Sequence, residues 1–123
     1  MASIADRVLD NGLTILDTEA NRVDLTSQEA ASYTEATSTY TLGNKTSISI
    51  GSPTDRTGGG RKVTMAAISD GTITGTGTAT HYAIVDTANS RLLVTGSLTA
   101  SQSVTTGNTF SLEALDIGIP DPS

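Results

Sequence analysis

The stretch THYAIVD-TANS-RLLVTGSL, residues 80–98, decides the fold class of this 123-residue chain. Its outer segments, 80–86 and 91–98, are rich in the β-branched and aromatic residues that favour extended strands. The four residues between them, 87–90, have the length and polarity of a hairpin loop. The sequence therefore predicts an antiparallel hairpin at this place.

Further strand patterns lie on both sides of this hairpin. They share alternation or enrichment in Thr, Val and Ile, and they cover residues 22–27, 45–50, 61–69, 72–78, the surroundings of Val104, and 110–119. Turns are predicted at Asp70-Gly71 and Gly107-Asn108, and Ile68 interrupts the alternation as a bulge or a two-sided position would. Seven or eight short strands joined by turns predict an all-β fold, an antiparallel β-sandwich or a partly open barrel.

The chain is long enough for one hydrophobic core. The expected core residues are the apolar side chains on the inward faces: Val23, Leu25, Ile48, Val63, Met65, Tyr82, Ile84, Leu92, Val94, Phe110, Leu112 and Ile117. At about 2 kcal/mol for each buried large aliphatic side chain, such a core only just offsets the entropy of ordering the chain. We therefore expect partner contacts to add to stability.

The N-terminal segment is the only strong helix pattern. Ser3 is a suitable N-cap, Ile4, Val8 and Leu9 fall on one face, and Gly12 suits the residue that stops a helix. Residues 13–16 are either a further turn of helix or an extended arm. The expected organisation is therefore a helix or arm over residues 1–20 and a single β-sandwich domain over 21–123.

Two segments lack a strand pattern. Residues 28–44 are predicted to form an ordered excursion, in which Ser32 and Glu35 have capping-box spacing and Tyr33 and Tyr40 anchor the segment to the body. Residues 51–60 contain one proline and three successive glycines, a composition typical of a mobile loop.

The charge of the chain is acidic, with a formal net charge of −6 and a pI near 4.4. Nucleic-acid binding requires clustered Lys and Arg, and an anionic membrane surface has the same requirement, so we expect neither partner. The N-terminal residues lack the pattern of a secretion signal, and no apolar run has the length of a membrane span. About 30 % of the residues are Ser or Thr, and none is Cys.

Few residues have the chemistry of a catalytic or metal site. The single histidine, His81, lies in a predicted strand, where a side chain directed away from the core is the simpler interpretation. No serine stands in a Gly-x-Ser-x-Gly elbow, and one histidine without cysteine is too little for zinc. The glycines of 58–60 lead into a strand, whereas a phosphate-binding loop leads into a helix. We expect no enzyme activity, no cofactor and no metal.

Four segments together resemble a known class of proteins. They are ADRVLDNGL (5–13), TATHYAIVD (78–86), RLLVTGSL (91–98) and VTTGNTF (104–110). Their order is similar to that in small proteins encoded in the structural-gene regions of tailed phages and prophages. The resemblance implies a non-enzymatic virion protein, either a capsid decoration (cement) subunit or a tail, head–tail connector or fibre accessory subunit.

The resemblance also implies partners and a location. The expected partners are the major capsid protein, other copies of the chain, or both, and a trimer is one possible assembly of the copies. The expected location is the virion, after synthesis in the host cytoplasm. The candidate contact residues are Ile4, Val8, Leu9, Leu13, Tyr33, Tyr40, Arg56 and Arg61. Two alternatives stay open for the N-terminal helix, which lies either against a neighbour or on its own sandwich.

Overall fold

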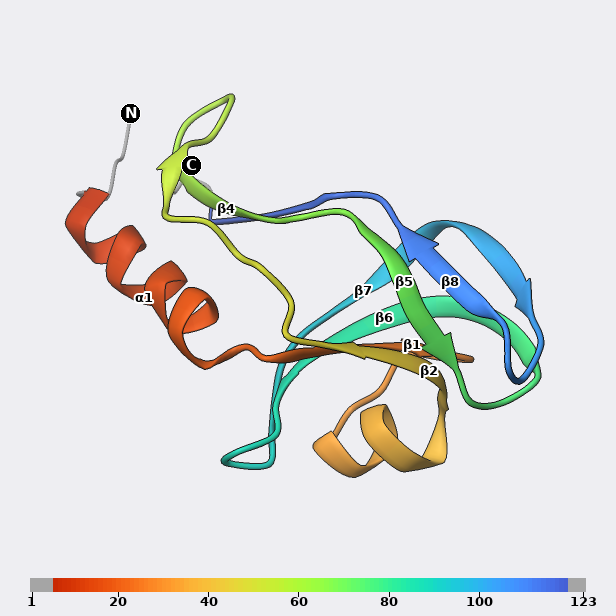
Figure 1. The fold of residues 1–123 in the computed structure, drawn as a ribbon. Helices are drawn as coiled ribbons and strands as arrows, with labels where there is room; N and C mark the ends of the chain where they lie inside the picture. Colours follow the sequence, from red (N-terminus) through yellow and green to blue (C-terminus); the bar gives the residue numbers. More distant parts are fainter. Residues whose placement is uncertain (1–5, 120–123) are drawn as a thin grey trace.

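A computed structural model of the protein describes residues 6–119, which form one α-helix, one π-helical turn and nine strands (Figure 1). The elements are α1 (Asp6–Glu19), β1 (Arg22–Thr26), η1 (Glu35–Thr39), β2 (Thr41–Thr46), β3 (Thr54–Asp55), β4 (Arg61–Met65), β5 (Ile68–Ile73), β6 (Gly77–Asp86), β7 (Arg91–Val104), β8 (Thr109–Leu112) and β9 (Leu115–Ile119). Every strand pair is antiparallel. The predicted all-β fold with an N-terminal helix is confirmed.

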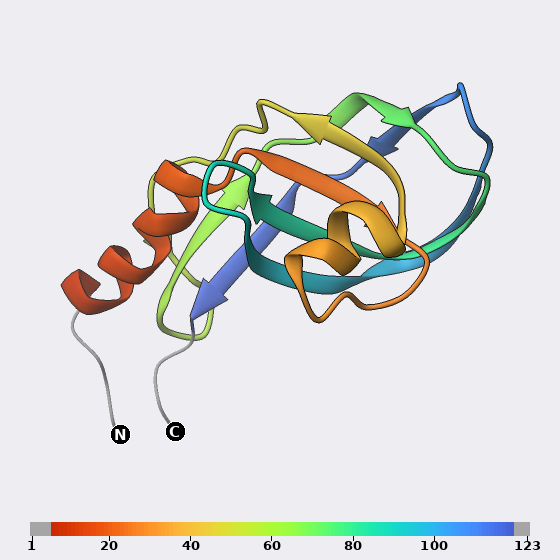
Figure 2. The same ribbon diagram turned by 90° about the horizontal axis from the view of Figure 1, so that it is seen from below.

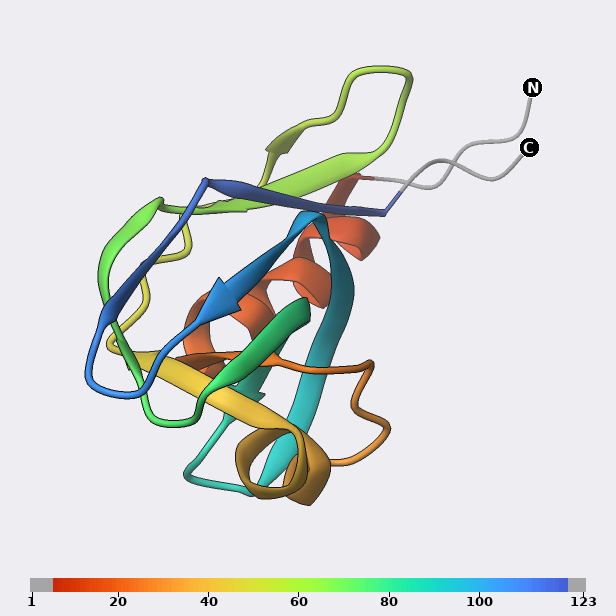
Figure 3. The same cartoon turned by 90° about the vertical axis from the view of Figure 1, so that its right-hand side faces the viewer.

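The strands form two sheets that share a corner. The large sheet has the order β7-β6-β1-β2-β5-β8, and the small sheet has the order β3-β4-β9. β4 continues into β5 and β8 continues into β9, so two antiparallel strands pass from one sheet to the other side by side. Such corners join the layers of sandwiches. The sheets are curved around the core but are not closed into a barrel (Figure 3).

The main hydrophobic core lies between the curved large sheet, the small sheet and α1. Of the predicted core residues, seven are buried, namely Val23, Leu25, Val63, Met65, Ile84, Phe110 and Leu112. Ile48, Tyr82, Leu92, Val94 and Ile117 are only partly buried at the borders of the packed clusters. Other buried core residues were not among those expected in the core, namely Leu13, Leu16, Leu42, Ile50, Ile68, Ile73 and Val104.

The helix extends past Gly12, so the prediction that this glycine stops it was wrong. Leu13 and Leu16 follow at helical spacing, and burying both side chains against the core favours continuation of the helix. A Cβ at Gly12 would lie 3.6 Å from Cδ1 of Ile119, so the glycine lies against β9. Because α1 also contacts β4, it packs on its own sandwich.

Three predicted strands have other bounds. The one predicted at 72–78 is not a single strand, because β5 ends at Ile73, β6 begins at Gly77, and residues 74–76 connect the two. The strand predicted at 45–50 is instead β2, Thr41–Thr46, and it ends where Ser47 adopts a φ of 57°. The strand predicted at 61–69 divides into β4 and β5 at the corner, which explains the broken alternation at Ile68. Asp70 and Gly71 lie inside β5 and form no turn: Gly71 pairs with Phe110 of β8, and Asp70 lies in the irregularity between the paired residues Ile68 and Gly71.

The central hairpin is confirmed, with β6 and β7 joined by residues 87–90. The Asp86 carboxylate begins the loop by accepting hydrogen bonds from the Ala88 backbone N–H at 3.0 Å and from Asn89 Nδ2 at 2.7 Å. β7 continues to Val104, so the separate strand predicted there is the end of the same one. The turn at Gly107 is also confirmed, with a φ of 91°.

The excursion after β1 covers the outer face of the large sheet (Figure 2). Its core is a second, smaller apolar cluster, made of Ala30, Ala36, Ala83 and Val85 with Tyr33, Tyr40 and Leu92 around them. Ser32 Oγ accepts the N–H of Glu35 at 3.2 Å, and Glu35 Oε1 accepts the N–H of Ala31 at 2.7 Å, so these side chains fix the start of the helical turn.

Candidate functional site

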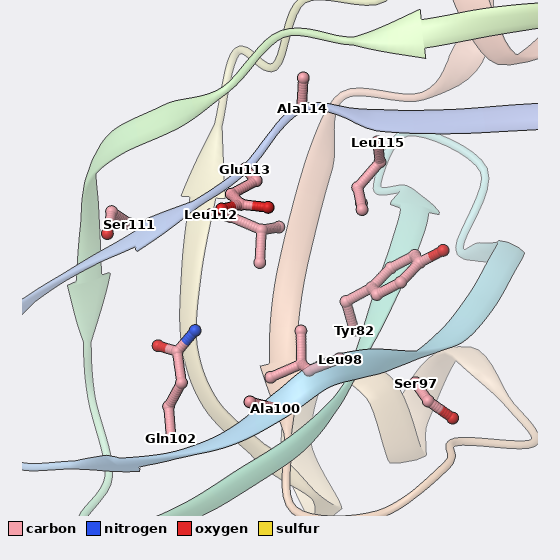
Figure 4. A pocket seen from close by; sticks show the side chains of 10 residues that line it. All are labelled: Tyr82, Ser97, Leu98, Ala100, Gln102, Ser111, Leu112, Glu113, Ala114 and Leu115. Carbon is pink, nitrogen blue, oxygen red and sulfur yellow. The ribbon is translucent and has the colours of Figure 1, made fainter.

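The two outer strands of the large sheet, β7 and β8, border a common cavity of about 440 Å³. We call this cavity the slot. Its walls come from β7 on one side and from β8 and the β8–β9 corner on the other, and Tyr82 of β6 contributes as well. The lining residues are Tyr82, Ser97, Leu98, Ala100, Gln102, Ser111, Leu112, Glu113, Ala114 and Leu115 (Figure 4).

A large β-bulge in β7 shapes one wall of the slot. Ser97 pairs with His81 and Gln102 pairs with Ala79, so four residues of β7, 98–101, lie opposite the single residue Thr80. A bulge leaves extra residues unpaired and bends its strand. Among the described residues, β6 is the only strand that pairs with β7, so the outer edge of β7 faces the slot without a partner strand.

The floor of the slot is apolar. Leu112 and Leu115 point into it from the β8–β9 segment, toward Tyr82 and Leu98 on the opposite side (Figure 4). The Tyr82 ring lies over its cross-strand partner Gly96, where a Cβ would be 2.7 Å from Cζ. Burial raises the pKa of Tyr82, so the phenol is neutral at physiological pH.

The rim of the slot is polar, with Ser97, Gln102, Ser111 and one carboxylate, Glu113. Hydrogen bonding in β5–β8 fixes the direction of the backbone groups here. Ile73 N donates to Asn108 O at 2.9 Å, and because these groups alternate along an antiparallel strand, those of Ser111 point away from β5. The N–H and C=O of Ser111 are therefore directed at the open edge.

A second hollow of about 330 Å³ lies beside the small sheet and is mainly polar. It is lined by Arg56, Thr57, Lys62, Asp116 and Gly118. Asp116 accepts hydrogen bonds from Thr64 at 2.7 Å and from Lys62 at 3.0 Å, and these bonds lower its pKa. Arg56 Nη1 donates to the carbonyl of Gly59 at 3.0 Å. The charged groups of the hollow thus have partners on the small sheet for Lys62 and Asp116 and within the loop for Arg56.

The loop 51–60 is held to the body by more contacts than its composition indicated. It contains the two-residue strand β3, and Gly58, Gly59 and Gly60 all have positive φ angles. Arg61 binds Asp10 of α1 at 2.8 Å and Asp55 of β3 at 2.6 Å, so it joins the helix to the small sheet.

The predicted contact residues whose side chains the structure describes lie in separate places, and none of these lines the slot. Leu13 is 2 % exposed in the main core, Tyr33 and Tyr40 pack in the outer layer, and Arg56 and Arg61 lie beside the small sheet. Ile4 lies outside the described residues, and so do the side chains of Val8 and Leu9. Leu13 is thus buried within its own subunit, whereas the two tyrosines are partly buried there.

The predictions about catalytic chemistry concern His81 above all. It alternates with the core-facing Tyr82, so it lies on the other face of β6, where its Nδ1 is 2.8 Å from Thr80 Oγ1. Within residues 6–119 no three His, Asp or Glu side chains gather in a group suited to a metal ion. In the same part of the chain, no helix has the length and hydropathy of a membrane span.

Sequence patterns did not reveal the slot because its residues are brought together by the curvature of the sheet. One signal was available: the segment GSLTASQS, 96–103, continues after a strong hairpin strand without Pro, Asn, Asp or a second Gly to end it. Such a run is compatible with a long, irregular edge strand.

No protein-family model, curated protein or solved structure matches this chain.

Proposed function

We propose that the chain is a non-enzymatic structural subunit of a tailed-phage virion, and specifically a capsid decoration (cement) protein that binds and stabilises the assembled head. The observation that carries the proposal is the slot, where two unpaired strand edges enclose an apolar floor. Unpaired edges of this kind are surfaces for protein–protein contact. The resemblance of residues 78–110 to phage structural-region proteins supplies the context.

The physical properties of the chain suit this role. A decoration subunit is made in large numbers and must stay soluble before it meets a shell, and a net charge of −6 opposes self-association. A site of about 440 Å³ offers only modest affinity by itself. On a shell the same contact repeats at every lattice position, and repetition adds stability to the assembly without strong single contacts.

The alternative is a tail, connector or fibre accessory subunit that assembles with copies of itself. It is favoured by a second apolar spot at the other end of the molecule, where Ile15 is 47 % exposed and Ile119 is 36 % exposed. Ile119 lies against Gly12 of α1, so the two isoleucines belong to one α1–β9 surface. A ring or trimer would bury this surface between subunits.

Co-sedimentation tests the proposal. Purified chain is mixed with heads assembled from the major capsid protein encoded in the same gene cluster, and the pellet is assayed for the chain with tails and unassembled capsid protein as controls. We expect saturable binding to heads and a higher temperature of head disruption. Binding to tails alone, or a stable ring or trimer of the free chain in light scattering, would support the accessory-subunit alternative instead.

A further inference from the structure

We propose that the slot accepts an extended segment of a partner protein as an added β-strand, with apolar side chains on the floor and a basic residue beside Glu113. The partner's identity as a shell protein rests on the proposed function. The strand-accepting property itself is argued from the slot alone, in three steps.

The first step concerns backbone hydrogen bonds. The N–H and C=O of Ser111 point away from β5 at the open edge of β8, and Ser111 lines the slot together with Leu98 and Ala100 from the bulged segment of β7. An added strand gains affinity from main-chain hydrogen bonds of this kind, and it gains specificity from the pockets that take its alternate side chains. The slot offers both features, because its apolar floor lies between the two edges.

The second step concerns size. The rise along a strand, the spacing between strands and the spacing between sheets together give roughly 160 Å³ for each residue of a packed strand. A cavity of about 440 Å³ therefore holds roughly three residues. With three residues, one or two side chains face the floor formed by Tyr82, Leu98, Leu112 and Leu115, and the segment's ends extend past the rim.

The third step concerns charge and decides the kind of occupant. Among the described side chains, Glu113 is the only charged one that lines the slot, and it is exposed at the rim. The chain as a whole carries −6, so a second copy brings repulsion whereas a basic segment brings attraction. These observations favour a different protein that offers an extended segment with Val or a similar residue flanked by Lys or Arg.

A defined peptide tests the inference directly. The probe is acetyl-Lys-Thr-Val-Thr-Val-Lys-amide, and the matched control is the same peptide N-methylated at its internal amides, which cannot donate to an edge. Amide chemical shifts of the 15N-labelled chain are followed during titration. We expect saturable shifts confined to residues 97–102 and 111–115 with the first peptide and no binding of the methylated one.

Two substitutions of Ser111 separate the contribution of its backbone N–H to peptide binding from the contribution of its side chain. Ser111→Pro removes an N–H that points at the slot, and proline is tolerated at such a position on an edge strand. Losing one hydrogen bond lowers the affinity for the peptide about three- to tenfold. Ser111→Ala keeps the N–H and should bind within about twofold of the original chain. Glu113→Gln should weaken the basic peptide about threefold at low salt, because the ion pair is exposed.

Several results would overturn strand addition. They are equal binding of the methylated peptide, peptide shifts outside the slot, absence of binding, and equal affinity of the Pro and Ala variants. Shifts of slot signals with protein concentration alone would make a second copy the occupant. If Ser111→Pro fails to fold, the methylated peptide decides. If both Ser111 variants still bind heads, the slot is not the head-binding site, and the decoration role remains. If the chain binds the peptide but not heads, the decoration role is refuted.

Discussion

Gly71→Ala tests the packing on which the corner between the two sheets depends. Gly71 is buried in β5 and is the direct cross-strand partner of Phe110 in β8. A Cβ at this position would lie 2.6 Å from Cδ1 of the Phe110 ring and closer still to Cε1 and Cζ. Carbon atoms in contact prefer about 3.5–4.0 Å, so the ring must move by roughly 1 Å or more.

The expected loss follows from that displacement. Phe110 is 4 % exposed in the main core, and overpacking a site of this kind costs about 1–3 kcal/mol. Replacing glycine by alanine also lowers the conformational entropy of the unfolded chain, and this effect raises the free energy of unfolding by roughly 0.4–1 kcal/mol. The net destabilisation is therefore about 1–2 kcal/mol, a fall in Tm of roughly 5–10 °C for a domain of this size.

The assay is thermal and urea unfolding of the variant beside a matched control, Gly75→Ala. A Cβ at Gly75 would lie 3.6 Å from Leu42, an ordinary contact, so this variant should equal or slightly exceed the parent in stability. In the Phe110→Ala background, Gly71→Ala should cost nothing, because the ring is gone. Equal stability of both glycine variants, or the same loss with and without Phe110, would refute the placement of the ring.

The remaining predictions concern ionisable groups. Arg22→Met should lower the free energy of unfolding in urea by about 3–5 kcal/mol, because the Asp24 carboxylate is fully buried and accepts hydrogen bonds from Arg22 Nε at 2.7 Å and from Arg22 Nη2 at 2.8 Å. Adding Asp24→Asn to this variant should restore part of the lost stability. Hydrogen bonds from Asn89 and Ala88 lower the pKa of Asp86, so the carboxylate's contribution to the free energy of unfolding is complete above about pH 4 and is lost as pH falls through the folded pKa. The free energy of unfolding of Asp86→Ala should therefore be lower than that of the parent at neutral pH and approach it in acid. Burial raises the pKa of Tyr82, so the contribution of this residue to stability should be constant below about pH 10 and fall as pH rises toward the folded pKa. Tyr82→Phe should lack this decline. An equal loss of stability at alkaline pH in the parent and in Tyr82→Phe would contradict this prediction.

Local signals were sufficient where neighbours in sequence are also neighbours in space. The β6–β7 hairpin was predicted because its strands, its four-residue loop and its pairing all lie within one short segment. The start of β2 was missed because pairing with β1 and β5, distant in sequence, determines its bounds. Gly12 and Gly71 resembled a stop and a turn, yet each lies where another element approaches closely, Ile119 in one case and Phe110 in the other.

The same devices that pack the sheet also build the slot. Gly96 and Gly71 are each paired directly with an aromatic residue, Tyr82 and Phe110, whose ring lies over the position of the missing side chain. Tyr82 can serve as part of the slot's floor because Gly96 carries no Cβ, and the bulge at 98–101 interrupts the pairing of β7 with β6 until Gln102. Gly96, Tyr82 and the bulge therefore shape the floor and one wall of the slot together.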